Sequence, residues 1–274
     1  MKRLAALAGM LLALPAFSAH SASPCNIAYP SDAQLEWHCE TLRKDDTLEK
    51  RFGPQWADVA RFNRIDRRHA YPGVRIKVPA QLEQLAGFSP LPPELPEATT
   101  DAQLILVDLA EQFLGAYTFG RLEFALPITS GRADTPGLET PNGDLRITAL
   151  HRARASSLYS IEGTDTPYPM NYALRFFVTR HGVQYWIHGR DLPGYPISHG
   201  CIGLYDEAMQ HEYYGVPADP QLADAKRLYL WALGPRADDG KVQFISDGPR
   251  VLIRGHAPLP RTRDESLTIN PAIK

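Results

Sequence analysis

One cysteine and two histidines are the residues of this sequence best suited to covalent chemistry. Cys201 stands 13 positions after His188 and two after His199. A thiol acts as a nucleophile when a base within hydrogen-bond reach takes its proton and a third group orients that base. In an extended segment His199 and Cys201 share one face, whereas His188 reaches the thiol from a neighbouring strand. With backbone N–H groups around Gly200 as candidates for an oxyanion hole, the segment predicts a cysteine nucleophile with a histidine base.

Two other interpretations of these residues stay open on the sequence alone. Cys201 can be a buried structural cysteine beside two core histidines. Alternatively, His188, His199 and Cys201 can be three ligands of a zinc ion. No H-x-x-x-H or C-x-x-C pair supports the zinc site, so we predict no metal and no other cofactor.

The first residues have the pattern of a secretory signal peptide. Lys2 and Arg3 precede an apolar run from Leu4 to Phe17, and small residues then lead to Ser23. The run is shorter than the roughly 20 residues of a membrane span, and no later stretch approaches one. We expect residues 1–23 to be removed and the mature protein to be exported, to the periplasm or an equivalent compartment. The alternative is a buried N-terminal helix.

The cysteine count supports a free thiol. The sequence has three cysteines, so one stays single if the other two bond. Disulfides persist in exported compartments, and Cys25 and Cys39 lie close together early in the mature chain. We predict that they bridge, closing a loop of about 15 residues and contributing ~3 kcal/mol; two unpaired thiols are the alternative. Cys201 is then the single thiol, either buried and inert or reactive.

Composition excludes several other classes of protein. With 44% hydrophobic and 22% charged residues, the 274-residue chain is too apolar for a disordered protein. Its 20 glycines and 24 prolines follow no collagen-like period. The net charge is −2, and −4 without Lys2 and Arg3, so the basic surplus of a nucleic-acid-binding protein is absent. Length, composition and charge do not indicate whether the protein is a monomer or an oligomer.

Residues 24–80 have the pattern of a small α+β domain. Asp45 to Thr47 offers an N-cap for a first helix, and Trp56 to Phe62 predicts a second. The alternation from Val74 to Val78 predicts a strand. The expected order is strand, helix, helix, strand.

The chain after residue 80 divides into three further parts. Residues 81–102 carry a run of prolines, which predicts an extended, semi-rigid linker. Residues 103–256 change to an apolar period of two and predict a mainly β domain, followed by a polar tail at 257–274. The expected strands are 104–108, 112–119, 122–126, 145–149, 174–179, 183–188, 242–245 and 251–253, and the expected helices are 206–214 and 220–233.

The segment from His188 to Ile202 resembles the L,D-transpeptidase catalytic domain of the YkuD-like family. His-Gly followed by Ser-His-Gly-Cys-Ile matches its catalytic motif. Upstream segments that match in order are Leu126–Gly131, Thr140–Gly143, Tyr168–Met170 and Leu174–Phe176. The resemblance covers roughly residues 103–254 and implies a mixed β-sandwich with a few helices.

The resemblance also implies roles for the motif residues. Cys201 is the nucleophile, His188 is the base, and the Gly189 carbonyl orients that base. The residues that line the site or shape its turn and oxyanion hole are His199, Ser198 and Gly200. The candidate substrate-binding residues are Tyr168, Met170, Arg175, Tyr185 and Arg190.

The reaction of that family implies an enzyme acting on peptidoglycan. The thiolate attacks a stem-peptide carbonyl, and the acyl group passes to the amine of a neighbouring stem, giving a 3→3 cross-link. Water as the acceptor makes the protein an L,D-carboxypeptidase or another editing hydrolase. A third interpretation is a glycan-binding wall protein without activity.

Two departures from the family pattern bear on the substrate. Gly203 stands where the motif usually has arginine, which leaves Arg190 or Arg175 to hold a stem-peptide carboxylate. A surface or structural ion pair is the alternative for both arginines. The segment between His188 and Ser198 is shorter than is common in the family. A different linkage, such as 1→3, therefore stays open.

Residues 24–80 also resemble a LysM module. Asp46-Thr47-Leu48, Asn63 and the segment Pro72–Pro79 occur in the order of that family. The resemblance implies binding to the N-acetylglucosamine-containing glycan strands of peptidoglycan, and the alternative is a small packing module without a ligand. The expected partners are thus stem peptides and glycan strands, with no nucleic acid and no membrane span.

Overall fold

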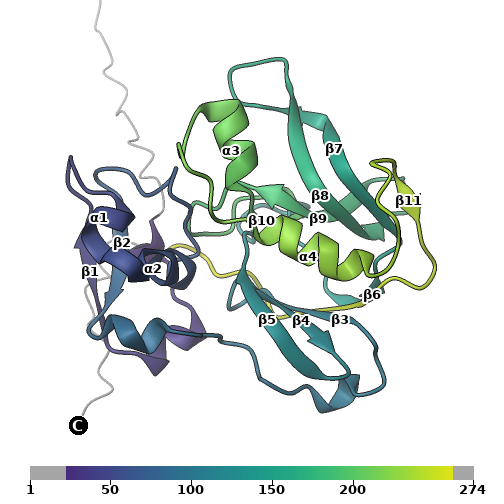
Figure 1. Ribbon diagram of the computed structural model, residues 1–274, viewed down its shortest axis with the longest axis horizontal. Coiled ribbons are helices and arrows are strands. Elements are labelled where there is room, and N and C mark those ends of the chain that lie inside the picture. Colours follow the sequence, from purple (N-terminus) through teal and green to yellow (C-terminus); the bar gives the residue numbers. More distant parts are fainter. Residues whose placement is uncertain (1–22, 262–274) are drawn as a thin grey trace, which may run out of the picture.

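A computed structural model describes residues 23–261 of the chain (Figure 1). Most of the expected signal peptide, 1–23, and of the expected tail, 257–274, lies outside the described residues. Within residues 23–261, no helix has the length and apolar character needed to span a bilayer. Figure 1 shows a smaller N-terminal lobe beside a larger lobe that holds most of the strands.

The N-terminal lobe has the strand, helix, helix, strand order that the sequence predicts. Strands β1 (Trp37–Thr41) and β2 (Arg75–Pro79) pair antiparallel. Helices α1 (Leu48–Phe52) and α2 (Trp56–Phe62) lie between them in sequence, and the Thr47 hydroxyl caps α1 by accepting a backbone N–H at 3.2 Å. The core of this lobe includes Leu48, Val59, Phe62 and Ile76. Its short 3-10 helices are η1 (Pro24–Asn26), η2 (Pro30–Gln34) and η3 (Gly53–Gln55).

A disulfide joins Cys25 in η1 to Cys39 in β1, with an S–S distance of 2.02 Å. Cys201 is the free cysteine. The bond ties the first described residues to the small sheet of the N-terminal lobe.

The segment 81–102, expected to be an extended linker, is packed against the larger lobe. Leu91 and Leu95 are buried in one cluster with Tyr117, and the Leu95 N–H donates to the Gly120 carbonyl at 2.7 Å. The prolines exclude long regular elements, but the leucines between them bury apolar surface, so the segment is not a free spacer. Its 3-10 helices are η4 (Leu82–Leu85) and η5 (Pro96–Ala98).

Two five-stranded sheets form the larger lobe, with the orders β5-β4-β3-β12-β6 and β10-β9-β8-β7-β11. Helix α4 (Asp224–Leu233) joins one buried apolar cluster with residues of both sheets, and α3 (Glu207–Tyr214) follows β10 (Figure 1). The predicted mainly β architecture with few helices is confirmed. The strands are β3 (Leu104–Asp108), β4 (Phe113–Thr118), β5 (Arg121–Pro127), β6 (Gly143–Arg146), β7 (Ala149–Ser160), β8 (Pro167–Val178), β9 (Gln184–Arg190), β10 (Ile202–Tyr205), β11 (Gln243–Phe244) and β12 (Arg250–Arg254).

The hairpin of β7 and β8 and the strand β10 differ most from the predicted elements. The sequence predicts no strand between Ala149 and Leu174, yet β7 runs on to Ser160 and β8 begins at Pro167. The extra residues of β7 are mostly exposed, so they lack the apolar alternation that marks a strand. β10 is buried throughout and parallel to β9, and a short run buried on both faces has no period of its own.

Candidate active site

Strands β9 and β10 bring the two predicted catalytic side chains together. They pair in parallel, with Gly203 beside His188. Cys201 comes just before β10 and is therefore level with Trp186 on β9. Because side chains alternate along a strand, Cys201, Trp186 and His188 lie on one face of the sheet.

His188, the predicted base, is buried and neutral. It is only 2% exposed, and its Nδ1 lies 2.7 Å from the Gly189 carbonyl oxygen. Since a carbonyl only accepts, the ring proton is on Nδ1 and Nε2 is free to accept another. Burial lowers the His188 pKa to about 3, assisted by the charges of Arg190 and Arg154 and opposed by the Gly189 hydrogen bond. The imidazole is therefore neutral at pH 7.

Cys201 is a free and partly exposed thiol. Burial raises its pKa above the ordinary value, while the Trp186 backbone and the charges of Arg190 and Arg154 act in the opposite direction. The resting pair is thus a neutral thiol and a neutral imidazole. For Cys201 to act as a nucleophile from this state, proton transfer from sulfur to nitrogen has to accompany its attack.

The turn Ser198–Gly200 presents the cysteine. The Ser198 hydroxyl accepts the Gly200 N–H at 3.1 Å and donates to the Cys201 carbonyl. Gly200 has a φ of +107°, and a Cβ there would lie 2.2 Å from the Tyr185 ring, so only glycine fits. Because the Gly200 N–H is already bonded, the Cys201 N–H is the better candidate for the oxyanion hole.

His199 lies at the rim of the site. Its side chain is exposed and stacks on Tyr159 of β7, with 4.4 Å between ring centroids and 22° between planes. Burial and the charges of Arg190 and Arg132 lower its pKa. This position suits contact with a substrate, and His188 stays the candidate for the base.

The side chain of Arg190 lies over Gly203, the position where the family motif usually has arginine. A Cβ on Gly203 would lie 2.7 Å from both Cβ and Cδ of Arg190. The Arg190 guanidinium lies 5.4 Å from the centre of the Tyr168 ring. Its charge acts to lower the pKa values of Cys201 and both flanking histidines. Of the two arginines expected to replace the missing one, Arg190 is the one whose charge acts on the thiol.

The other expected substrate-binding residues follow β8 and β9. One apolar cluster contains Met170, Tyr168, Trp186 and Cys201. Tyr185 lies against the turn before the cysteine. Arg175 Nε donates to Thr148 Oγ1 at 3.0 Å, and its guanidinium lies 5.9 Å from the Trp186 ring centre. Arg175 is thus bonded within the protein, whereas the other four surround the turn or the thiol.

Arg154 and Trp186 belong to the site although the sequence analysis did not single them out. Arg154, on β7 beside Met170, lies 4.5 Å from the Trp186 ring centre, and its charge acts on Cys201. Arg154 Nε and Trp186 Nε1 are buried without a hydrogen-bond partner in the described structure. Arg154 reaches the site because β7 extends past Ala149. The residues of this extension are mostly polar and exposed, so the sequence analysis did not recognise them as a strand.

One group of side chains has the spacing of a metal site, and it does not include the thiol. Asp66, His69 and Asp191 offer ligand atoms within 4.8 Å of one another. Asp66 already accepts four hydrogen bonds, and the cation of Arg68 is 3.3 Å from Asp191. These donors fill the positions that a metal would take, so we assign no metal there. The zinc set considered from the sequence is not such a group within residues 23–261.

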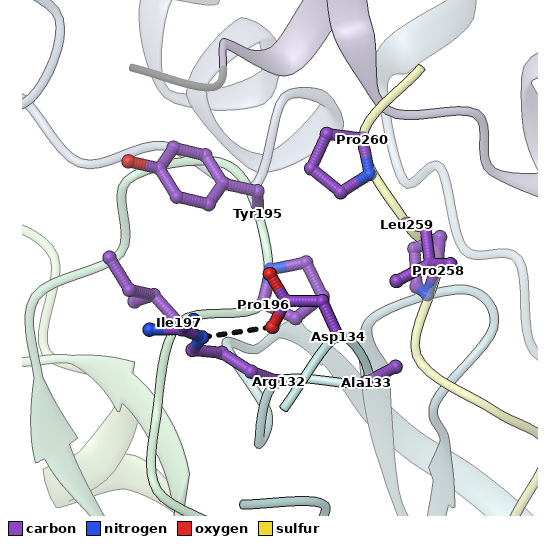
Figure 2. Close-up of a pocket in the computed structure, with 9 residues that line it drawn as sticks. All are labelled: Arg132, Ala133, Asp134, Tyr195, Pro196, Ile197, Pro258, Leu259 and Pro260. Atoms are coloured by element: carbon purple, nitrogen blue, oxygen red, sulfur yellow. Dashed lines mark hydrogen bonds and ion pairs between the residues drawn. The ribbon is translucent and has the colours of Figure 1, made fainter. Parts of the chain in front are cut away.

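A cavity of about 260 Å³ adjoins the turn that leads to the cysteine (Figure 2). Its walls come from residues 132–134, 195–197 and 258–260. The Arg132 side chain on one wall forms an ion pair with Asp134 at 3.0 Å. The Arg132 backbone N–H donates to the Ser198 carbonyl at 3.2 Å. The cavity does not include Cys201, so it is a neighbour of the candidate site.

A family model described as the L,D-transpeptidase catalytic domain, YkuD, matches residues 102–251, more than half of the chain. No curated protein matches the sequence.

Three solved structures illustrate the similarity to known proteins. An L,D-transpeptidase (residues 123–326) from Xylanimonas cellulosilytica DSM 15894 is 22% identical, with 72% of this chain and 78% of that chain covered and a TM-score of 0.40. An L,D-transpeptidase from Stackebrandtia nassauensis is 19% identical, with 76% and 69% covered and a TM-score of 0.36. An LD transpeptidase in complex with imipenem is 18% identical, with 56% and 59% covered and a TM-score of 0.35.

Proposed function

Since this chain belongs to the YkuD family of L,D-transpeptidase catalytic domains, we propose that it is an exported enzyme that cross-links peptidoglycan stem peptides through an acyl-enzyme on Cys201. One observation carries the proposal: a buried, neutral His188, oriented by the Gly189 carbonyl, lies on the strand beside the free thiol. A neutral imidazole beside a neutral thiol is the arrangement that general-base attack requires.

In the proposed first half-reaction, Cys201 Sγ attacks the carbonyl carbon of a donor stem peptide while His188 Nε2 takes the thiol proton. The carbonyl oxygen becomes an oxyanion, and the Cys201 N–H is its candidate donor. As the intermediate collapses, the C–N bond breaks and His188 returns the proton to the leaving amine. The terminal D-alanine departs and a thioester remains on the cysteine.

In the second half-reaction, the amine of a neighbouring stem attacks the thioester carbonyl. His188 accepts a proton from that amine and delivers it to sulfur as the C–S bond breaks. The free thiol is restored, and the new amide joins the two stems. We propose a 3→3 cross-link, with a 1→3 cross-link as the variant that the short loop after His188 leaves open.

The side chains around the thiol are proposed to hold the donor stem. Arg190 carries a positive charge beside Cys201 and suits a stem-peptide carboxylate. Tyr168 and Met170 share an apolar cluster with the cysteine and suit the aliphatic part of the stem. Arg175 is the weaker candidate, because it is already bonded to Thr148.

Hydrolysis is a second candidate activity, and the partial exposure of Cys201 favours it. If water reaches the thioester before an amine does, the product is a shortened stem and no cross-link. The protein would then be an L,D-carboxypeptidase or another peptidoglycan-editing hydrolase.

We propose that residues 24–80 are a LysM-like module that binds glycan strands. Their strand, helix, helix, strand order supports this assignment. Tyr71 is 48% exposed and offers an aromatic ring to a sugar. The disulfide between Cys25 and Cys39 supports export, because such bonds persist in oxidising compartments.

Incubation with purified tetrapeptide muropeptides tests the proposed reaction. Cross-linked dimers are the expected product. Tripeptide monomers alone would favour hydrolysis, and unchanged substrate would overturn both activities. A carbapenem is an independent probe, because a thiol that opens its β-lactam ring keeps a covalent adduct. The intact mass should rise in the wild type and not in Cys201→Ala.

A further inference from the structure

The loop between the two catalytic strands is held by the N-terminal lobe. Residues 191–197 leave β9, which carries His188, and lead toward the turn before Cys201. The Asp66 N–H donates to the Leu192 carbonyl at 2.8 Å. The Leu192 N–H donates to the Asp66 carboxylate at 2.6 Å. A residue of one lobe therefore pairs its backbone and its side chain with the active-site loop of the other.

Gly194 is a second point where this loop contacts the N-terminal lobe. The Tyr29 hydroxyl donates to the Gly194 carbonyl at 3.0 Å. Gly194 has a φ of +93°, and a Cβ there would lie 2.5 Å from Pro24 Cγ. The neighbouring Pro193 forms an isolated antiparallel β-bridge with Ile65 of the N-terminal lobe. The Pro24 ring and the Asn63 carbonyl leave no room for a side chain at Gly194.

Asp66 is the centre of the contact and is fully buried. Its oxygens accept hydrogen bonds from the His69 N–H, His69 Nδ1, the Leu192 N–H and Gln210 Nε2, at 2.6 to 2.8 Å. Gln210 Nε2 also donates to Asp191 at 2.9 Å. Hydrogen bonds to a charged acceptor are the stronger kind, so the carboxylate holds the loop firmly.

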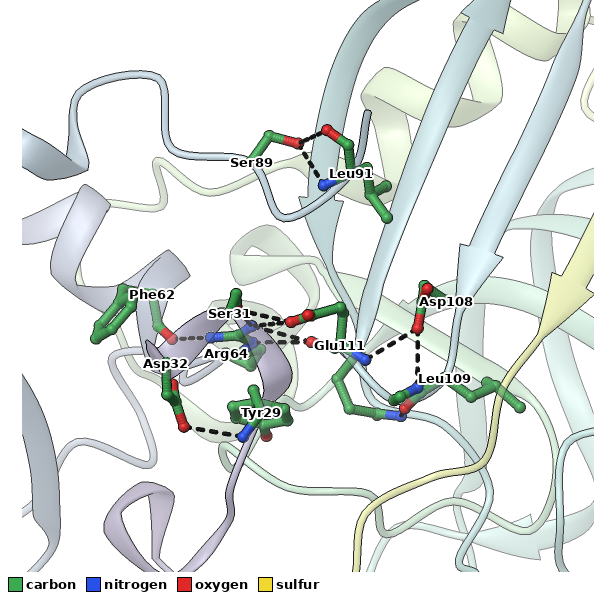
Figure 3. Close-up of polar contacts among 12 residues, drawn as sticks. Tyr29, Ser31, Asp32, Phe62, Arg64, Ser89, Leu91, Asp108, Leu109 and Glu111 are labelled. Carbon is green, nitrogen blue, oxygen red and sulfur yellow. Dashed lines mark hydrogen bonds and ion pairs between the residues drawn. The ribbon is translucent and has the colours of Figure 1, made fainter. Parts of the chain in front are cut away.

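The segment 61–68 carries four arginines, and each pairs with an acid of the larger lobe. The pairs are Arg61 with Asp224, Arg64 with Glu111, Arg67 with Glu207, and Arg68 with Asp191. Figure 3 shows the fully buried Arg64 between the lobes, bonded to Glu111 and Ser31. The two lobes thus share a row of ion pairs. Its last member, Arg68, pairs with Asp191 in the loop 191–197.

A chain of contacts leads from Asp191 to the thiol. The Tyr168 hydroxyl donates to Asp191 at 3.0 Å. The guanidinium of Arg190 lies over the Tyr168 ring at 5.4 Å, which suits a cation–π contact. The Arg190 stem crosses Gly203, and its charge acts on Cys201. The Tyr168 hydroxyl is fixed by its hydrogen bond to Asp191, and Arg190 is placed by its contacts with the Tyr168 ring and Gly203.

We propose that Asp66 and Arg68 of the N-terminal lobe are positioning residues for the reaction at Cys201. Arg68 contacts Asp191 directly, and Asp66 is linked to Asp191 through Gln210. Through Asp191 and Tyr168 the two residues hold the guanidinium of Arg190 beside the thiol. The inference rests on the proposed function and deepens it, because the lobe becomes part of the active site as well as a candidate glycan binder.

The experiment compares full-length Asp66→Asn and Arg68→Gln with the wild type. The matched controls are Asp45→Asn and Arg43→Gln, whose exposed side chains make no hydrogen bond in the described structure. Two quantities are measured: the rate constant of carbapenem acylation by intact mass, and the pH midpoint of iodoacetamide alkylation. Melting temperature shows whether each variant is folded.

The acylation rate should fall about 10- to 100-fold in Asp66→Asn, because small misplacements of catalytic groups have effects of that size. Arg68→Gln should lose less, and Arg68→Lys should regain part of the loss. The alkylation midpoint should move to higher pH in both test variants, since the charge of Arg190 is less well placed. Both controls should match the wild type.

Folded test variants with wild-type acylation and wild-type alkylation would overturn the inference. If Asp66→Asn does not fold, Arg68→Gln decides alone, because its side chain is 31% exposed and its loss leaves no deeply buried gap. A wild type that no carbapenem acylates would contradict the proposed function. Alkylation still tests the positioning role in that case, because it needs no substrate.

Discussion

The interface between the lobes and the face around Cys201 both contain arginines, but their polar groups are satisfied differently. At the interface, Asp66 accepts four hydrogen bonds and Arg67 is bidentate to Glu207. Around the thiol, Arg154 Nε, Arg190 Nε and Trp186 Nε1 are buried without a partner in the described structure. Gln210 Oε1 is the exception at the interface.

We interpret the paired groups of the interface as groups that stabilise the fold, and the unpartnered groups around Cys201 as candidate ligand-binding groups. Buried polar atoms normally find partners within the protein, so a cluster of unpartnered ones needs an explanation. At the candidate active site, a stem peptide with its amide and carboxylate groups would supply the missing partners. At the interface, by contrast, Gln210 Oε1 is the exception, and the carboxylate of Asp66 and the guanidinium of Arg67 have their partners within the protein.

The largest effect should come from His188→Ala. Removing the base should slow carbapenem acylation by about 10²- to 10⁴-fold, because general-base assistance has that range. The melting temperature should show that the variant is folded. A wild-type acylation rate would move the base role to His199.

An interface arginine should matter for stability. Arg64→Met should lower the free energy of unfolding by about 3–5 kcal/mol, because it leaves the buried Glu111 without its cation. Urea unfolding of the full chain measures this loss. A loss below about 1 kcal/mol, the range of surface ion pairs, would show that the interface pair is not structural.

An arginine of the site should matter for substrate instead. Arg154→Met removes a group with an unpartnered Nε, so the free energy of unfolding should change by no more than about 0.5 kcal/mol, the range of ordinary surface positions. The kcat/KM for muropeptides should fall about tenfold, the loss of one charge-assisted contact of ~1.4 kcal/mol. Equal losses of stability in Arg154→Met and Arg64→Met would remove the distinction between the two regions.

The smallest effect concerns pH. Since burial raises the Cys201 pKa, thiol alkylation should have its midpoint above the ordinary value of 9.0. Arg190→Ala should move the midpoint higher still, because the arginine charge favours the thiolate. A pH series with iodoacetamide measures both, since the other two cysteines are bonded. A midpoint below 9.0 in the wild type would mean that the resting thiol is already activated.

The sequence predicted those elements whose signal is local. Thr47 caps α1, α3 begins next to the expected start at Asp206, and the apolar period of two marks β3 to β5. The exposed part of β7 and the fully buried β10 lack such a period, so they were missed. The Pro-rich segment 81–102 was expected to be an extended, semi-rigid linker, yet Leu91 and Leu95 are buried in a cluster with strand residues of the larger lobe.

The motif around Cys201 allowed the free thiol and His188 to be singled out as candidates, because those residues are close in sequence, and the structure places them at neighbouring strands. The contribution of Arg154 and the pairing of Arg68 with Asp191 depend on segments far apart in the chain. Such pairings follow from the tertiary fold, so no local spacing reveals them. The run of arginines from Arg61 to Arg68 was visible, but its acidic partners were not.

Mass spectrometry of the enzyme quenched with a tetrapeptide donor tests the central claim most directly. With no acceptor present, we predict a tripeptide thioester on the proteolytic fragment that contains Cys201, and its absence in Cys201→Ala. A wild type that forms cross-links or tripeptide without this adduct, or with the acyl group on another residue, would contradict the account.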